Sequence, residues 1–226
     1  MTINSPTTIN VEELKSRMLR RRTIIPRFRL PMDKQQTKDA LMAAIMAEVE
    51  FRHRTFIPND KLTAQIEKMA EWLTKEHRKF GILLCGKCGN GKSTMVKALQ
   101  QLLNILGIRN EYTNRYYGMQ IISAKEINAL VSKDYANLAR LARTDMLAID
   151  DLGTEPLEVL NYGNVMSPII DLLTQRYEEQ LFTIITTNLT PDMIRKVYGE
   201  RIADRLCEMT EIVVFDNDSC RRNNTI

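Results

Sequence analysis

The sequence predicts an α/β fold built on a largely parallel sheet. From Gly81 onward, short apolar runs alternate with helical patterns, which is typical of that architecture. The run at residues 146–149 is continuously apolar, as expected for a strand buried on both faces. The chain of 226 residues is long enough for one main domain with a small appendage. The expected strands span residues 82–85, 119–123, 146–150, 182–186 and 212–215.

Helical patterns precede the sheet. Asn10 followed by Glu13 is typical of a helix start, and this helix is expected to end near Arg22, before two prolines. Apolar residues recur at helical spacing over residues 34–52 and again from Asp60 onward. We therefore expect three helices ahead of the first strand.

The basic residues are concentrated at the N-terminus. Residues 1–35 hold eight Lys or Arg against three Asp or Glu, a net charge of +5 within a chain whose formal net charge is +4. The arginine cluster at residues 20–22 could contact nucleic-acid phosphates or an acidic partner, or it could form a solvated helix face. We expect residues 1–58 to be a helical, basic, partner-binding region and residues 59–226 to form the main domain.

The composition argues against membrane and secreted proteins. No stretch approaches the roughly 18 uncharged apolar residues of a membrane helix, and the N-terminus does not resemble a secretory signal. We therefore expect a cytoplasmic protein. Cys85 and Cys88 have a C-x-x-C spacing, but a zinc site needs four ligands, and the sequence has no second such pair and only two histidines. Packing in a reducing cytosol is the interpretation that we prefer.

Residues 86–93 match the phosphate-binding pattern G-x-x-x-x-G-K-[ST] between an apolar strand and a helix. In such a loop, glycines let backbone N–H groups turn toward phosphate oxygens, and the helix N-terminus adds a favourable dipole. Lys92 should reach the β and γ phosphates of ATP and should face solvent when no nucleotide is bound. The predicted nucleotide-binding residues are Gly86, Lys87, Cys88, Gly89, Asn90, Gly91, Lys92, Ser93 and Thr94.

Two later strands end in polar residues that suit the same chemistry. Asp150 follows an apolar run and, with the hydroxyl of Ser93, is the predicted Mg²⁺ ligand set. Asp151 is placed to activate the attacking water, although a glutamate would reach further, so slow hydrolysis is expected. Asn188 could bind the γ-phosphate or the water, or it could merely cap a helix. For Asp150 and Asp151, the alternative interpretation is a surface turn.

Arginines near the C-terminus complete the predicted site. Arg201 and Arg205 lie four residues apart, on one helix face, where a guanidinium could neutralise charge on the nucleotide of a neighbouring subunit. The alternative is an ion pair with Glu200 or Glu208. Arg221, a few residues past the last strand, could return to the nucleotide of its own subunit.

Together these residues resemble the AAA+ ATPases of the DnaC/DnaI helicase-loader and IstB transposition-helper group. The resemblance implies a P-loop NTPase fold of the AAA+ type, with a five-stranded, mostly parallel sheet and no C-terminal helical lid. It covers residues 81–222, and its most specific parts are residues 138–141, 145–153, 175–177, 186–189 and 199–206.

The resemblance also implies roles for particular residues. Asn188 is similar to the group's sensor 1, Arg205 to its arginine finger with Arg201 as a neighbour, and Arg221 to its sensor 2. ATP and Mg²⁺ are the implied cofactors. A homo-oligomer with ATP sites between subunits is the implied assembly.

Three functions remain open at this point. The leading hypothesis is an ATP-controlled loader that binds single-stranded DNA and a replicative hexameric helicase. The second is a transposition helper that acts on double-stranded DNA with a transposase. The third is an ATP-binding scaffold that hardly hydrolyses, because an aspartate occupies position 151. We expect phosphate contacts to dominate DNA binding, since only 6% of residues are aromatic; the candidates for base stacking are Tyr112, Tyr116, Tyr117 and Tyr135.

Overall fold

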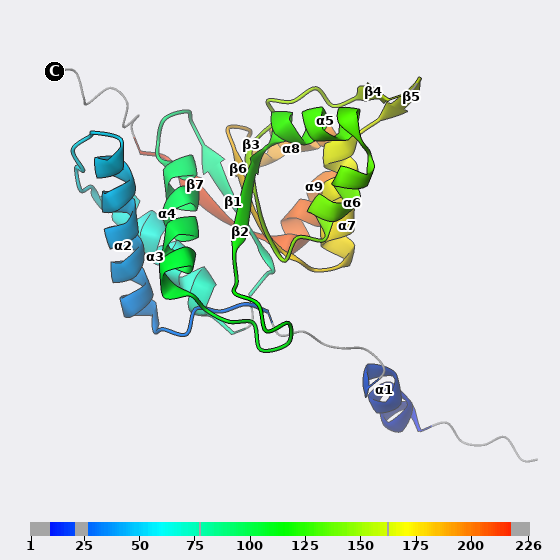
Figure 1. Cartoon of the computed structure of the whole chain (residues 1–226), viewed down its shortest axis with the longest axis horizontal. Helices are drawn as coiled ribbons and strands as arrows, with labels where there is room; N and C mark the ends of the chain where they lie inside the picture. The colour runs from blue at the N-terminus through cyan, green and yellow to red at the C-terminus, as the bar shows by residue number, and fades with distance from the viewer. Residues whose placement is uncertain (1–9, 21–26, 77, 162, 218–226) are drawn as a thin grey trace, which may run out of the picture.

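The computed structural model describes residues 10–20, 27–76, 78–161 and 163–217, and a parallel sheet lies at its centre (Figure 1). The strand order is β2-β3-β6-β1-β7, and every neighbouring pair is parallel. These strands are β1 (Gly81–Gly86), β2 (Met119–Ser123), β3 (Met146–Leu152), β6 (Phe182–Thr187) and β7 (Thr210–Phe215). All five predicted strands are confirmed, and all but β2 extend one or two residues beyond a predicted end.

The expected N-terminal helices are also present. Asp33 and Gln36 form a capping box at the start of α2, and Ser123 and Glu126 form one at α5. In the described part of the chain, no helix is long and apolar enough to cross a membrane. The helices are α1 (Val11–Arg20), α2 (Lys34–Phe51), α3 (Asp60–Thr74), α4 (Lys92–Leu106), α5 (Ala124–Lys133), α6 (Ala136–Ala142), α7 (Pro168–Glu178), α8 (Pro191–Tyr198) and α9 (Glu200–Met209).

Helices cover both faces of the sheet. Figure 1 shows α2, α3 and α4 on one side and α5 to α9 on the other. Successive residues of a strand point to opposite faces, so Leu84 of β1 packs with α2 to α4 while Leu83 packs with α5 to α9. Burial on both faces explains why the core strands read as continuous apolar runs.

The N-terminal region contains two kinds of helix. The side chains of residues 11–19 in α1 are exposed. In contrast, α2 packs against α3 and α4, and its Leu41 and Ile45 belong to the same core as those helices. The Leu30 N–H also donates to the Leu73 carbonyl at 3.0 Å. The division of the chain at residue 58 stays a prediction, and α2 is packed on the main body.

A buried arginine fastens the amino end of the sheet. Arg176 of α7 is 0% exposed. Its Nη1 donates to the carbonyls of Ala142 (2.9 Å) and Thr144 (2.8 Å), its Nη2 to the carbonyl of Phe182 (2.6 Å) and its Nε to Thr183 Oγ1 (2.9 Å). Burial lowers the pKa of Arg176 to about 9. One side chain thus joins α7 to the residues that precede β3 and to the start of β6.

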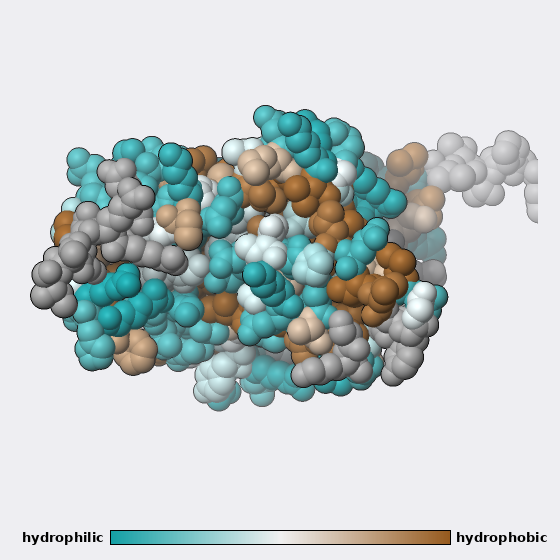
Figure 2. Space-filling model, turned by 90° about the horizontal axis from the view of Figure 1, so that it is seen from above, coloured by the Kyte–Doolittle hydropathy of each residue, from teal (hydrophilic) through white to brown (hydrophobic). Residues whose placement is uncertain are grey.

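A small hairpin lies outside the predicted elements. The strands β4 (Val159–Asn161) and β5 (Asn164–Met166) pair antiparallel between β3 and α7 in the chain. Three-residue strands are too short to give a periodic signal. The hairpin projects at the upper right of Figure 1 and exposes Leu160 and Val165. Seen from above, the molecule shows several hydrophobic patches among hydrophilic residues (Figure 2).

Candidate nucleotide-binding site

The predicted phosphate loop connects β1 to α4 at the carboxyl end of the sheet. Gly86 has a φ of 149°, and a Cβ at this position would lie 2.1 Å from the Phe215 carbonyl oxygen, so only glycine fits. Gly91 has a φ of 95° and forms the N-cap of α4 without any side-chain hydrogen bond. The N–H groups of the first turn are therefore left for another acceptor, as an anion site requires.

Lys92 does not face solvent, which corrects our expectation. The side chain is buried, and its Nζ donates to the carbonyls of Gly86 (2.7 Å) and Lys87 (2.8 Å) and to Oδ1 of Asn188 (2.9 Å) and Asn90 (3.3 Å). Burial lowers the pKa of Lys92, and the nearby Asp151 opposes this effect. The lysine thus makes three of its four hydrogen bonds to residues of the phosphate loop itself. The contact to Asn188 joins two predicted site residues that are 96 positions apart.

The predicted metal ligands meet as expected. Ser93 Oγ donates to Asp150 Oδ1 at 2.9 Å, and Thr186 Oγ1 donates to the same oxygen at 2.6 Å. The N–H of Asp151 in turn donates to Thr186 Oγ1 at 2.9 Å. Thr186, which is buried on β6, therefore positions both acids. Thr186 lies in a predicted strand, but no motif assigned it this role.

Asp151 lies at an irregularity of β3. The register between β3 and β6 shifts between Ile149 and Leu152, and Asp151 has a φ of 57°. A bulge of this kind re-aims a side chain, and left-handed conformations outside glycine are uncommon. Asp151 thereby lines the cavity beside the phosphate loop.

A set of amides ties the phosphate loop to the end of the sheet. Asn90 Nδ2 donates to the Phe215 carbonyl at 2.5 Å, and Asn217 Nδ2 donates to the Asn90 carbonyl at 3.1 Å. Gln65 Nε2 of α3 donates to Asn217 Oδ1 at 3.2 Å. This network fixes the loop against α3 and β7. Asn217 and Gln65 were not predicted as site residues, because amides carry no motif of their own.

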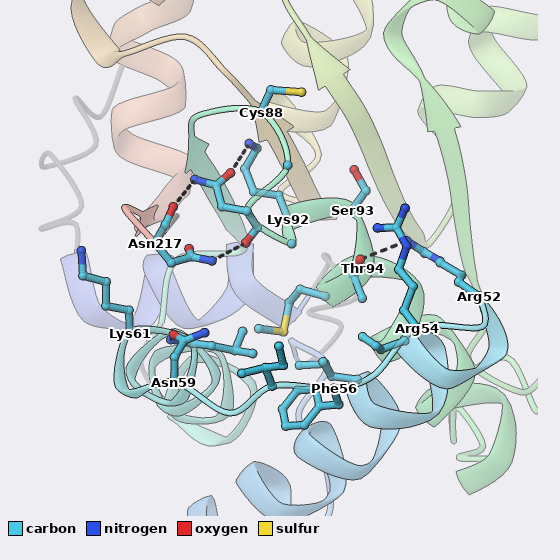
Figure 3. A pocket seen from close by; sticks show the side chains of 18 of the residues that line it. Arg52, Arg54, Phe56, Asn59, Lys61, Cys88, Lys92, Ser93, Thr94 and Asn217 are labelled. Atoms are coloured by element: carbon cyan, nitrogen blue, oxygen red, sulfur yellow. Dashed lines mark hydrogen bonds between the residues drawn. The ribbon is translucent and has the colours of Figure 1, made fainter. Parts of the chain in front are cut away.

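A cavity of about 800 Å³ lies beside the loop, and Figure 3 shows the side chains that line it. Its second wall comes from residues 52–62, the connection from α2 to α3 and the first turn of α3. Arg52 Nη1 donates to Thr94 Oγ1 at 3.1 Å, and Phe56 and Ile57 add apolar surface. A cavity of this size with cationic and apolar walls suits a nucleotide, which has charged phosphates and a flat base. No motif in the sequence predicted this wall.

The predicted arginines have different surroundings. Arg201 is exposed. Arg205 is 13% exposed; its Nη1 donates to Thr174 Oγ1 at 2.8 Å and its Nη2 pairs with Glu178 Oε1 at 2.9 Å. The ion pair is thus with α7 and not with Glu200 or Glu208. Arg221 lies outside the described residues. The roles of all three arginines stay predictions.

The cysteines form no metal site within the described ranges. Cys85 is buried, whereas Cys88 and Cys207 are exposed. The described residues hold no cluster of three or more His, Cys, Asp or Glu that could bind a metal ion. Burial raises the pKa of the Cys85 thiol.

A sequence comparison decides the family. The model for the IstB-like ATP binding protein family matches residues 10–226. The chain belongs to the IstB-like ATP-binding family. For this IstB-like chain, a comparison with curated proteins gives no match.

Solved structures agree with the fold of this IstB-like protein. The DnaC helicase loader has a TM-score of 0.54 at 21% identity and covers 71% of this chain and 93% of its own. DnaI has a TM-score of 0.50 at 21% identity, covering 71% and 87%. The replication initiator DnaA bound to AMPPCP and single-stranded DNA has a TM-score of 0.53 at 16% identity, covering 72% and 49%. The predicted AAA+ type of P-loop fold is confirmed.

Proposed function

We propose that this protein hydrolyses ATP and uses the cycle to load a replicative hexameric helicase onto single-stranded DNA. The observation that carries the ATPase part is the meeting of Lys92, Ser93, Asp150 and Asn188 beside a cavity of nucleotide size. The helicase and the DNA are supported by the likeness to a helicase loader and to an initiator bound to single-stranded DNA. The membership of an ATP-binding family agrees with the first part.

The contacts of Lys92 suggest how ATP would bind. Lys92 donates to neutral carbonyl and amide oxygens, and charged phosphate oxygens are stronger acceptors. ATP should therefore draw Nζ away from the carbonyls of Gly86 and Lys87. The N–H groups at the uncapped start of α4 would hold the same phosphates. Binding thus exchanges internal hydrogen bonds for stronger ones.

Hydrolysis would use the two acids in different ways. Ser93 Oγ and Asp150 Oδ1 are the hard oxygen donors that Mg²⁺ prefers, and bound Mg²⁺ would offset charge on the phosphates. Asp151 lines the cavity, so its carboxylate is placed to take the proton from the attacking water. Asn188 would orient that water or the γ-phosphate. The products are ADP and inorganic phosphate.

The arginines of α9 would serve the site of a neighbouring subunit. Arg201 is exposed and can contact a neighbour directly. Arg205 can do so only after its contacts to Thr174 and Glu178 open. A guanidinium that stabilises the transferring phosphoryl group is worth about 10³–10⁵ in turnover. A site shared in this way would make hydrolysis depend on assembly.

Single-stranded DNA has a candidate surface on the loop between α4 and β2. Tyr112 and Tyr116 are 57% and 61% exposed, and the Arg109 guanidinium lies 5.0 Å from the Tyr116 ring centre. Exposed rings beside cations suit bases and phosphates together. Tyr117 is not available, because its ring packs on Phe28 with centres 4.6 Å apart.

The family name favours a second candidate, a transposition helper on double-stranded DNA that acts with a transposase. Pulldown with purified helicase and with purified transposase separates the two. The loader predicts ATP-dependent capture of the helicase and tighter binding of single-stranded than double-stranded DNA. Capture of the transposase alone, with a preference for duplex DNA, would replace the loader by the helper. Binding should weaken steeply with salt in either case.

Subunit mixing tests the shared site. Arg205→Ala should bind ATP but hydrolyse poorly, and Lys92→Ala should not bind ATP. A mixture of the two should recover part of the activity, because one interface then pairs an intact loop with an intact arginine. The same experiment with Arg201→Ala decides which arginine acts. If neither mixture recovers activity and turnover per subunit is independent of protein concentration, each site works alone. A single-turnover assay separates this result from a scaffold that hardly hydrolyses.

A further inference from the structure

A buried tyrosine–glutamate pair links the turn after the acidic residues to the helix before the arginines. The Tyr198 hydroxyl at the end of α8 donates to Glu155 Oε1, and the N–H of Gly153 donates to Glu155 Oε2 at 2.9 Å. The two residues are 5% and 8% exposed. Both carboxyl oxygens of Glu155 therefore accept a hydrogen bond, one from α8 and the other from the turn.

The glutamate side of the pair is continuous with the catalytic acids. Thr154, between Gly153 and Glu155, donates through Oγ1 to the Asp151 carbonyl at 2.8 Å and through its N–H to the same carbonyl at 3.3 Å. The turn at residues 151–155 is thus fastened at both ends. A shift of Glu155 would be transmitted to Asp151, whose left-handed φ of 57° already depends on its neighbours.

The tyrosine side is continuous with the arginine helix. Tyr198 is the last residue of α8, and only Gly199, with a φ of 83°, separates it from α9. The N–H of Gly199 donates to the Arg195 carbonyl at 3.0 Å, and the N–H of Ala203 donates to the Gly199 carbonyl at 3.2 Å. Two short helices therefore meet at one residue. Arg201 is on the first turn after it.

The pair is a costly way to fill a core. Tyr198 belongs to a buried apolar cluster that also contains Ile194, Ile202 and Leu206. A phenylalanine and an aliphatic residue would fill such space without burying a carboxyl group, which is expensive unless hydrogen-bonded. Burial, followed by the bond to Glu155, raises the pKa of Tyr198, so its hydroxyl stays a donor across the physiological range. A hydrogen bond that fixes the relative position of two segments explains why polar residues occupy these buried positions.

We propose that Glu155 and Tyr198 are positioning residues, which set the arginine-bearing start of α9 relative to Asp151. The inference rests on the proposed sharing of ATP sites between subunits. The turn belongs to the subunit's own site, whereas α9 serves its neighbour's. The pair therefore couples the state of one site to the placement of the arginines at the next.

The decisive variant is Tyr198→Phe, which removes one oxygen and keeps the ring. Tyr177→Phe is its matched control: Tyr177 OH of α7 donates to Glu208 Oε2 of α9 at 2.5 Å, so it also removes a tyrosine–glutamate bond to the arginine helix, but away from the turn. Hydrolysis is measured over a range of protein concentrations, with ATP affinity and melting temperature in parallel. A misplacement of about 1 Å can cost about 10²-fold in rate.

We expect Tyr198→Phe to lower kcat at high protein concentration by about 10–100-fold, with ATP affinity unchanged and Tyr177→Phe near wild type. Glu155→Gln keeps one acceptor oxygen, so its kcat should lie between those of the two tyrosine variants. In an Arg201→Ala, Arg205→Ala background, Tyr198→Phe should lower turnover no further, because it acts through those arginines.

Three results would overturn the inference while the proposed function stands. One is that Tyr198→Phe behaves like Tyr177→Phe in every assay. Another is that its effect multiplies fully with that of the arginine substitutions. The third is a lowered melting temperature with unchanged kcat, which would assign the pair to stability alone. If wild-type turnover per subunit does not depend on protein concentration, the shared site itself fails, and the coupling fails with it.

Discussion

The two ends of the sheet each bury a cation among neutral oxygens. At the carboxyl end, Lys92 is 5% exposed and donates to two carbonyls and two amide oxygens. At the amino end, Arg176 is 0% exposed and donates to three carbonyls and a hydroxyl. Burial lowers the pKa of both groups. Neither group has a carboxylate among these hydrogen-bond partners.

The difference lies in what adjoins each cation. Lys92 borders a cavity of about 800 Å³, so its ammonium group has room to turn to a ligand. Arg176 joins α7 to residues 142–144 and 182–183 and does not line that cavity. A buried cation is therefore not a functional signal in itself. The space beside it, and a ligand with stronger acceptors, make the difference.

The largest effect is expected at the carboxyl end. Lys92→Met should abolish ATP binding, since it removes the mobile cation aimed at the β and γ phosphates. Stability should change by less than about 1 kcal/mol, because water from the cavity can replace the lysine as a donor. Calorimetric titration with ATP and urea unfolding measure the two quantities. Lys97→Met, on the exposed face of α4, is the control. Tight ATP binding by Lys92→Met would refute the site.

Asp151, at the same end, should affect the chemistry without affecting ATP binding. Asp151→Asn keeps the size and hydrogen-bonding capacity of the side chain but removes the base. Turnover should fall by about 10²–10⁴-fold while ATP affinity persists. Asp151→Glu, which reaches further, should hydrolyse at an equal or faster rate. Single-turnover assays with both variants test this, and unchanged turnover in Asp151→Asn would remove it from the catalytic set.

At the amino end we expect a large loss of stability without a loss of ATP binding. Arg176→Met removes four hydrogen bonds and leaves buried acceptors unsatisfied, at about 1–3 kcal/mol each before relaxation. The free energy of unfolding should fall by about 3 kcal/mol or more, whereas the folded fraction should bind ATP normally. Arg143→Met, an exposed position at the same end, should stay within about 0.5 kcal/mol of wild type. A loss of ATP affinity in folded Arg176→Met would contradict the assignment of a purely structural role to the amino end of the sheet.

The sequence predicted the carboxyl end better than the amino end. Glycine spacing and strand ends are local patterns, so the place of the loop at residues 86–93 and of Asp150 beside it could be predicted from them. The role of Arg176 could not, although residues 175–177 belong to the resemblance, because three of its four partners are backbone carbonyls, which look alike in every sequence. The wall at residues 52–62 was missed for a similar reason: its place beside the loop depends on how α2 and α3 pack.

The surroundings of Lys92 show a second limit of sequence reasoning. The motif describes the lysine with a nucleotide bound, where its ammonium group reaches phosphate. In the structure the ammonium group donates to the carbonyls of Gly86 and Lys87, and nothing in the pattern specifies these acceptors. The motif therefore predicts the ligand of the lysine more directly than its contacts within the protein.

The smallest expected effect concerns a third cation, Arg205, which unlike the other two has a carboxylate partner. Its Nη2 lies 2.9 Å from Glu178 Oε1, but the Glu178 side chain is 61% exposed. Solvent screens such a pair, which is worth about 0–1 kcal/mol. Glu178→Gln keeps an acceptor oxygen and should lower the free energy of unfolding by less than about 1 kcal/mol. If Arg205 serves a neighbouring site, the weaker hold should leave turnover unchanged or raise it, whereas Arg205→Ala should lower turnover. If Glu178→Gln loses as much stability as Arg176→Met, Arg205 has a structural role, and that role is its contact with α7.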